Sequence, residues 1–528
     1  MTAHSTTAQG NNGENVNFCY SAKIMSSPPE ILLPPKQDAN VRNILEWLAM
    51  AHGRSGSEDA DQLNRQILLL RESPLPSDQR IKLLDLLYGQ AGRIANAEVR
   101  GLHDISLPIS RKLRQRLKIV LDLLATLTQD YFNTLADLFD PQGTSSPKSP
   151  HNSLRRAMYA IAWQVRITHL IAAPTPVGLW QQLHAAFATA RHLGLEEISG
   201  PHGSACIRRL YTNIILAAIA QPSSFSATEL EFITEYVAQC TPQVDLLDTP
   251  PGNSDGVFWI DPEKDVLGHA LIRRIPGPEA RVLYFSCDAI ATQALQHRTE
   301  LLEGTPAELL GLPAFADSHI GPGILLRLNR LWGHPAKRRF SRRRQSYRAS
   351  LCPGLTNLWQ LIKEPAAHHE VSEWMVTNES PDGYALMHMA GHTANLKVGD
   401  IVALQAIDDD PEAYSPWNIC IIRWAISENP EHIELGLQML APRAMAVEIA
   451  NPSAQKSRKV AALILPAMPP LRQAQSLVVP TGLINEATKR VVVMSENTNL
   501  SIRELQPFRL DEQSSMVEIF SVSPDDSP

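Results

Sequence analysis

A dense run of cations is the most distinctive chemical feature of this 528-residue chain. Residues 337–348 read KRRFSRRRQSYR, which places seven Lys or Arg side chains in twelve positions of a protein with a net charge of −7. No Asp or Glu occurs between Asp317 and Glu364. Six of the seven cations are Arg, whose planar guanidinium makes bidentate contacts with phosphate and with the guanine edge. The run therefore predicts a receptor for a phosphate or carboxylate anion.

A polar turn further along the chain could face the same anion. Residues 378–383 read NESPDG, with Asn378 and Ser380 two positions apart and Gly383 at the end. Asn and Ser side chains so spaced on a turn can point at one ligand, and glycine lets the backbone approach it closely. An Arg cluster beside these groups could hold a phosphorylated purine by neutralising phosphate and bonding guanine O6 and N7.

Together the two segments resemble the motifs of the PilZ domain, the bacterial receptor module for cyclic di-GMP. Arg338 and Arg342 match its RxxxR motif, and Asn378, Ser380 and Gly383 match its (D/N)xSxxG motif. The later segments 396–400, 417–425 and 434–440 resemble, in the family's order, its turn and closing strands. The resemblance covers residues 336–443.

The register of the arginine motif is open, because the frames 338/342, 339/343 and 344/348 all fit RxxxR. The first two are favoured since they precede the first predicted strand, 347–351, whereas the third runs into it. A predicted amphipathic helix at 354–362 explains the long spacing between the two motifs. The resemblance implies that the nucleotide-binding residues are Arg338, Arg339, Arg342, Arg343, Asn378, Ser380 and Gly383.

The hydrophobic pattern predicts a multidomain α + β chain, because 528 residues exceed what one core usually serves. An N-terminal helical bundle or TPR-like array is followed by a PilZ-like antiparallel β-barrel and a second small β domain. Linkers are expected at 141–153 and 442–459. The predicted division is 1–40 disordered, 41–243 helical, 244–335 a mixed α/β connecting region, 336–443 the PilZ-like barrel and 455–522 a small C-terminal β domain.

Local signals indicate where individual elements begin and pair. Ser110 is placed to cap a helix, and Ser226 with Glu229 forms a capping box before an apolar helix. The apolar segments 256–260 and 281–285 are typical of paired strands.

Several classes of function are disfavoured by what the sequence lacks. The six cysteines are scattered without a CxxC pair, and four His residues (368, 369, 388 and 392) have no Cys or carboxylate to complete a metal set. No nucleophile elbow, P-loop or Rossmann fingerprint occurs. We expect no enzyme activity, no metal and no cofactor. The N-terminus has no secretion signal and the chain no membrane-spanning run, so a cytoplasmic protein is predicted.

The favoured hypothesis is a signalling receptor that binds cyclic di-GMP and transmits binding to a protein partner through the helical region. The alternative is a protein-interaction scaffold whose degenerate PilZ barrel no longer binds nucleotide. A nucleic-acid-binding role for the basic run ranks third, because the whole chain is acidic and few aromatic residues are interleaved with the arginines.

Overall fold

A computed structural model describes most of the chain from residue 37 onward. The described residues are 37–50, 56–103, 105, 107–136, 150–240, 244–252, 255–336, 340–390, 393, 396–407, 415–429, 432–450, 459–469, 472–484, 490–496 and 500–524. Of the expected disordered segment 1–40, residues 1–36 lie outside them, as do the candidate ligands Arg338 and Arg339, whereas residues 37–40 begin the first helix, which corrects that bound.

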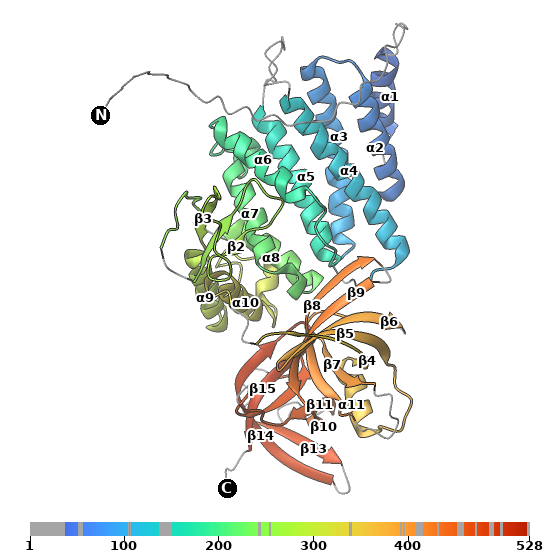
Figure 1. Ribbon diagram of the computed structural model, residues 1–528, viewed down its shortest axis with the longest axis vertical. Helices are drawn as coiled ribbons and strands as arrows, with labels where there is room; N and C mark the ends of the chain where they lie inside the picture. Colours follow the sequence, from blue (N-terminus) through green and yellow to red (C-terminus); the bar gives the residue numbers. More distant parts are fainter. Residues whose placement is uncertain are drawn as a thin grey trace, which may run out of the picture.

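The N-terminal part is helical, as predicted, and its helices stand side by side at one end of the molecule (Figure 1). The expected linker at 141–153 is partly wrong, because a helix begins at Pro150; proline suits the first turn, where its missing N–H leaves no bond unmade. The helices are α1 (Gln37–Met50), α2 (Gly56–Glu72), α3 (Ser77–Arg100), α4 (Arg111–Ala136), α5 (Pro150–Leu170), α6 (Leu179–His192), α7 (Ile207–Ile219) and α8 (Ala227–Cys240).

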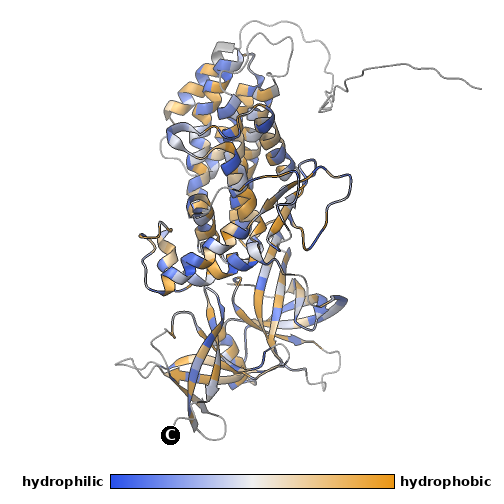
Figure 2. Ribbon diagram, turned by 90° about the vertical axis from the view of Figure 1, so that its left-hand side faces the viewer, coloured by the Kyte–Doolittle hydropathy of each residue, from blue (hydrophilic) through white to orange (hydrophobic). Residues whose placement is uncertain are grey.

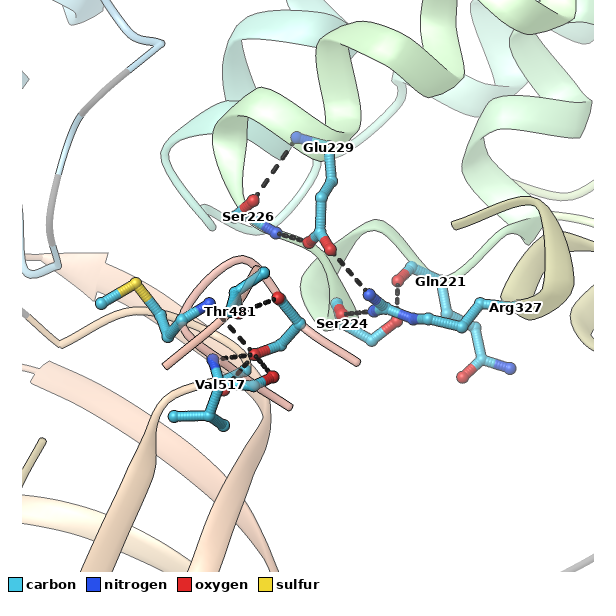
Figure 3. A network of polar contacts seen from close by, with 10 residues as sticks. Gln221, Ser224, Ser226, Glu229, Arg327, Thr481 and Val517 are labelled. Carbon is cyan, nitrogen blue, oxygen red and sulfur yellow. Dashed lines mark hydrogen bonds and ion pairs between the residues drawn. The ribbon is translucent and has the colours of Figure 1, made fainter. Parts of the chain in front are cut away.

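Both predicted helix caps are confirmed. The Ser110 hydroxyl accepts a hydrogen bond from the backbone N–H of Leu113 at 3.3 Å, at the start of α4. Before α8, the backbone N–H of Ser226 donates to Glu229 Oε2 at 2.7 Å, and the backbone N–H of Glu229 donates to Ser226 Oγ at 3.4 Å (Figure 3). This reciprocal pair satisfies two N–H groups that the first helical turn leaves open.

A small antiparallel sheet and two helices connect the helical part to the barrels. The predicted strand pair is confirmed: β1 (Val257–Ile260) pairs with β3 (Leu283–Ser286), and β2 (His269–Ala270) lies on the other side of β1. Helices α9 (Asp288–Leu302) and α10 (Gly321–Gly333) follow. The end of α10 leads into the basic run.

The first barrel is closed, in the strand order β4-β5-β6-β9-β8-β7. Alternating apolar residues fill its interior, where the large Trp374 is fully buried. The predicted helix at 354–362 is confirmed as α11 (Leu355–Lys363), between the first two strands. The strands are β4 (Arg343–Pro353), β5 (Ser372–Ser380), β6 (Gly383–Ala390), β7 (Ile401–Ala406), β8 (Asn418–Asn429) and β9 (His432–Ala441).

The second barrel is also closed, in the order β10-β11-β12-β15-β14-β13, so it repeats the strand order of the first. Its first strand lies inside the expected 442–459 linker, a correction explained by the buried alternation of Val447 and Ile449 in an otherwise short, Ala-rich segment. The strands are β10 (Met445–Ala450), β11 (Val460–Leu465), β12 (Gln475–Pro480), β13 (Val491–Glu496), β14 (Leu500–Gln513) and β15 (Val517–Pro524).

Three apolar clusters hold these parts together. The largest runs from the helices into the interior of the first barrel, and another fills the second barrel. A third lies between the barrels, where α11 and outward residues such as Ile401 and Ile419 meet Leu463 and Val517 of the second barrel. Apolar and polar residues interleave along the helices and strands accordingly (Figure 2).

The hairpin of β8 and β9 reaches the helices (Figure 1). The Arg114 guanidinium on α4 donates to the carbonyl oxygens of Ser427 and Glu428 and to the Ser427 hydroxyl. The backbone N–H of Ser427 donates to the carbonyl of Ala172 after α5, at 2.8 Å. No helix in the described part of the chain is long and apolar enough to cross a bilayer. The cytoplasmic location stays a prediction.

Candidate functional site

The pairing of β4 with β5 decides which arginine lies beside the polar turn. Arg344 is directly opposite Asn378, and Arg343 is directly opposite Glu379. Directly opposed residues of an antiparallel pair point to the same face. Asn378 is also opposite Ala385, and the next residue of β6, Leu386, belongs to the barrel interior. Arg344 and Asn378 therefore share the outer face of the barrel.

Ser380 lies on the same outer face, two residues beyond Asn378, at the end of β5. It pairs with Gly383 across a two-residue turn. Ser380 Oγ lies 2.7 Å from Asp382 Oδ1 and 3.2 Å from the carbonyl oxygen of Gly383. The hydroxyl donates to one of these acceptors and keeps its lone pairs for an incoming donor. The carbonyl of Asp382 accepts from the backbone N–H of Met439 at 2.9 Å, which fixes the turn to β9.

Glycine is required at position 383 because two strands approach each other closely there. It pairs with Gln438 of β9, and a Cβ atom built on it would collide with the backbone carbonyl oxygen of Leu437. Any side chain here would push β6 away from β9.

The described part of the basic run is open to solvent. Arg342, Arg343, Arg344 and Arg348 are all exposed. Within the described residues, Arg348 pairs with Glu373 at 3.3 Å, whereas no ion pair is found for the other three. These three guanidinium groups are thus free to meet an external anion.

Arg343 has a different setting from Arg344. Its opposite residue Glu379 accepts a hydrogen bond from the Tyr347 hydroxyl at 3.3 Å. Burial, together with this carboxylate, raises the pKa of Tyr347 to about 12, so the phenol stays a donor at neutral pH. A bulge between Arg344 and Tyr347 separates the start of β4 from the regular strand that follows. Of the three RxxxR frames, the one that the sequence disfavoured contains the arginine that lies beside Asn378.

Two further polar residues adjoin this face, and the sequence did not predict them as site residues. Gln438 is paired with Gly383, and its Oε1 accepts a hydrogen bond from Arg423 Nε at 2.6 Å. Arg423 stands at a bulge of β8, where the strand places an extra residue against β9. The sequence placed Arg423 within the predicted strand segment 417–425, but it did not show which residues lie beside it.

The histidines considered for a metal lie apart in the described residues. His388 packs against Trp374 with ring centroids 5.1 Å apart, and His369 Nε2 lies 2.8 Å from the carbonyl oxygen of Glu364. His392 is outside the described residues. Across the part of the chain that the structure describes, no three His, Cys, Asp or Glu side chains are grouped as a metal site.

Comparison with known proteins places these features in a family. The model for the N-terminal domain of the cyclic-di-GMP receptor FimW matches residues 42–251, and the model for its middle PilZ domain matches residues 360–446. Together they cover more than half of the chain. The second match contains the Asn378–Gly383 turn and begins after the basic run.

A curated relative extends the likeness beyond the two matched regions. The cyclic-di-GMP receptor FimW of Pseudomonas aeruginosa strain PAO1 is 21% identical over 548 aligned residues, which span 86% of each protein. The order of the two matched family models, an N-terminal domain and then a middle PilZ domain, agrees with the helical part followed by the first barrel in Figure 1. This chain therefore belongs to the PilZ-domain proteins, as a member that carries an N-terminal helical region.

Proposed function

We propose that this chain is a cyclic di-GMP receptor whose nucleotide lies on the outer face of the first barrel. The observation that carries the proposal is the register that puts Arg344 opposite Asn378, with Ser380 two residues along the same face. A cation with no ion pair among the described residues thus stands beside two neutral hydrogen-bonding side chains. That combination suits a ligand with phosphate and purine groups. The two family matches and the relative's printed name support the same ligand.

Each residue has a distinct proposed role. The guanidinium of Arg344 neutralises a phosphate or bonds the O6 and N7 edge of guanine. Asn378 and Ser380 hydrogen-bond the base or the ribose, and Gly383 allows the ligand to lie against the backbone. Arg342 precedes Arg344 by two positions, so strand alternation would bring it to the same face.

The other predicted arginines complete the cluster from its edges. Arg343 is assigned a weaker, long-range attraction, because its opposite residue Glu379 offsets part of its charge. Arg338 and Arg339 remain candidate ligands that would approach from the segment before β4. The proposed activity is binding and signalling, with no catalytic step and no cofactor.

The effect of nucleotide binding is proposed to reach the helical part through contacts at the two ends of β9. One end of this strand carries Gln438 opposite Gly383, and the other forms the hairpin whose Ser427 is bonded by Arg114 of the helical part. A nucleotide on the outer face would shift the position of this strand, and thereby the position of the helices that contact its hairpin. The helical part is proposed to bind a protein partner whose affinity depends on the nucleotide.

Isothermal titration calorimetry with cyclic di-GMP, GTP and cyclic di-AMP tests the proposal. Wild-type protein should bind cyclic di-GMP preferentially. Arg342→Ala, Arg344→Ala and Ser380→Ala should each weaken binding, the arginine variants by roughly 10- to 150-fold, since a charged hydrogen bond contributes about 1.5–3 kcal/mol. Arg343→Ala should have a smaller effect.

Arg348→Ala is the matched control. It removes an exposed arginine from the same strand, but this arginine pairs with Glu373 and lies opposite Met375, away from the turn. Its affinity should equal that of wild type. Failure of folded wild-type protein to bind cyclic di-GMP, or equal losses in all arginine variants, would refute the proposed site.

A further inference from the structure

A polar row leads from the proposed nucleotide face to the second barrel. Ser380 pairs with Gly383, and Gly383 pairs with Gln438. Gln438 is bonded by Arg423 of the next strand. Adjacent strands lie about 4.8 Å apart and Arg423 is two residues beyond Ile421, which is opposite Gln438, so Arg423 is roughly 12 Å from Gly383 across the sheet. That distance is within the reach of a ligand the size of a dinucleotide.

Arg423 also lines a cavity of about 300 Å³ where three parts of the molecule meet. The connecting region contributes Arg327 and Arg330 of α10, and the second barrel contributes the segment Glu512–Ser514 at the end of β14. The cavity is thus the place where a single small ligand would touch all three parts. It also continues the polar row away from Gly383.

Positive charge exceeds negative charge at this junction. Glu512 accepts a hydrogen bond from Arg423 Nη2 at 2.7 Å. Among the described residues that line the cavity, Glu512 is the acidic one. Burial alone would raise the pKa of Glu512, but the bond from Arg423 and the charges of Arg327 and Arg330 lower it overall. The carboxylate is therefore held as an anion inside an arginine cluster.

The three arginines differ in how firmly they are engaged. Arg327 is held by Glu229 at 2.9 Å and by the carbonyl of Ser224 (Figure 3). It also lies over the Phe225 ring. Arg330 is exposed, and no side-chain partner is found for it within the described ranges. Arg330 and Arg423 are accordingly the two groups that an incoming anion can recruit.

We propose that this junction cavity is a phosphate subsite of the nucleotide site, and that Glu512 is an internal carboxylate that occupies it when no nucleotide is bound. The inference rests on the proposed function. A phosphate of the nucleotide takes the place of the Glu512 carboxylate against Arg423 and Arg330. Glu512 thereby opposes binding, and occupancy of the first barrel is reported directly to the second.

The exchange does not require the barrels to separate. An apolar cluster that includes α11 holds them together. Ser514 Oγ donates to the carbonyl of Gly399 in the first barrel at 2.7 Å, and Gln513 Nε2 donates to the carbonyl of His319 at 2.7 Å. The consecutive residues Glu512, Gln513 and Ser514, at the end of β14, thus contact both the first barrel and the region that connects it to the helices. A shift of Glu512 would be passed on to the contacts of its two neighbours.

The test is the affinity of the full chain for cyclic di-GMP after Glu512→Gln. The amide oxygen still accepts from Arg423, so the fold is preserved, while the competing charge is gone. Binding should tighten by roughly tenfold, the effect of removing one like charge at short range in a partly shielded site. Arg330→Ala should weaken binding about fivefold with little change in the melting temperature, because no hydrogen bond or ion pair of its exposed side chain is found within the described residues.

Glu504→Gln is the matched control, since Glu504 is an exposed carboxylate on the same strand that lies 3.7 Å from Arg490. It should leave affinity unchanged. Wild-type protein that binds while Glu512→Gln binds no tighter, or while Arg330→Ala binds equally well, overturns the subsite and leaves the proposed function standing. A folded wild-type protein that binds no cyclic di-GMP overturns both.

Discussion

Asp400 offers a quantitative test of the electrostatics inside the first barrel. This residue lies in the turn before β7, is only 5% exposed, and accepts a hydrogen bond from the backbone N–H of Ile401 at 2.8 Å. Burial raises its pKa from 3.8 to about 7, against the opposing effects of that hydrogen bond and of Lys397. The substitution Asp400→Asn keeps the acceptor and removes the ionisable group.

The sign of the effect follows from proton binding. Because the folded pKa exceeds the unfolded one, the folded protein binds more protons than the unfolded chain between about pH 4 and pH 7. Stability therefore falls as the pH rises through this interval. One pKa unit corresponds to 1.36 kcal/mol, so a shift from 3.8 to about 7 gives a loss of about 4 kcal/mol by pH 8. Asp400→Asn should remove this loss.

Scanning calorimetry at pH 5 and pH 8, at equal ionic strength, measures the effect. The variant should gain on wild type between the two values by about 3 kcal/mol, or several degrees in melting temperature. Asp248→Asn, which changes an exposed carboxylate, should behave like wild type at both values. A difference between Asp400→Asn and wild type that is the same at pH 5 and pH 8 would refute the reasoning.

Three more substitutions probe how the parts are joined. Glu229→Ala removes the helix-capping carboxylate and the partner of Arg327, and should lower stability by about 2–4 kcal/mol in thermal melts followed by circular dichroism. Gly383→Ala forces a Cβ against the carbonyl of Leu437, and should lower stability by about 1–3 kcal/mol and weaken nucleotide binding in calorimetry. Arg114→Ala removes the bonds to the β8–β9 hairpin, and should increase hydrogen exchange of the hairpin amides.

Each of these changes has a control of the same chemical kind. Glu235→Ala alters an exposed residue of α8, Gly277→Ala adds a methyl group in open space, and Lys112→Ala removes an exposed cation from α4. All three should be close to neutral. A control as damaging as its partner would show that the assigned contacts do not carry the stability.

Much of the first barrel could be predicted because its signals are local. Turn residues and alternating apolar positions are read from a few neighbouring residues, so the predicted strand segments 417–425 and 434–440 overlap β8 and β9. The capping box of Ser226 and Glu229 depends on a spacing of three and was equally visible. The start of β4 was placed late, at 347, because its first residues are exposed arginines without an apolar pattern.

The arrangement of the candidate site was beyond local signals. Bulges at Arg344–Tyr347 and at Val376–Asn378 change which side chains share a face, and a bulge leaves no clear mark in a single sequence. This is why Arg344, which belongs to the frame that the sequence disfavoured, comes to lie beside Asn378. The pairing of Arg423 with Glu512 joins residues 89 positions apart, which only the packing of the two barrels brings together.

Because the two barrels share one strand order, their corresponding connections can be compared directly. In the first barrel, the hairpin between the second and third strands carries Asn378, Ser380 and Gly383. In the second barrel, the corresponding connection runs from Leu465 to Gln475 and reads PAMPPLRQA, with no Asn, Ser or Gly.

The same topology therefore lacks the polar turn in its second copy. What the second barrel adds at the junction is an anion, Glu512, directed at an arginine of the first. Under the proposed subsite, this carboxylate would compete with a phosphate of the nucleotide, so that nucleotide binding to the first barrel would be sensed by the second.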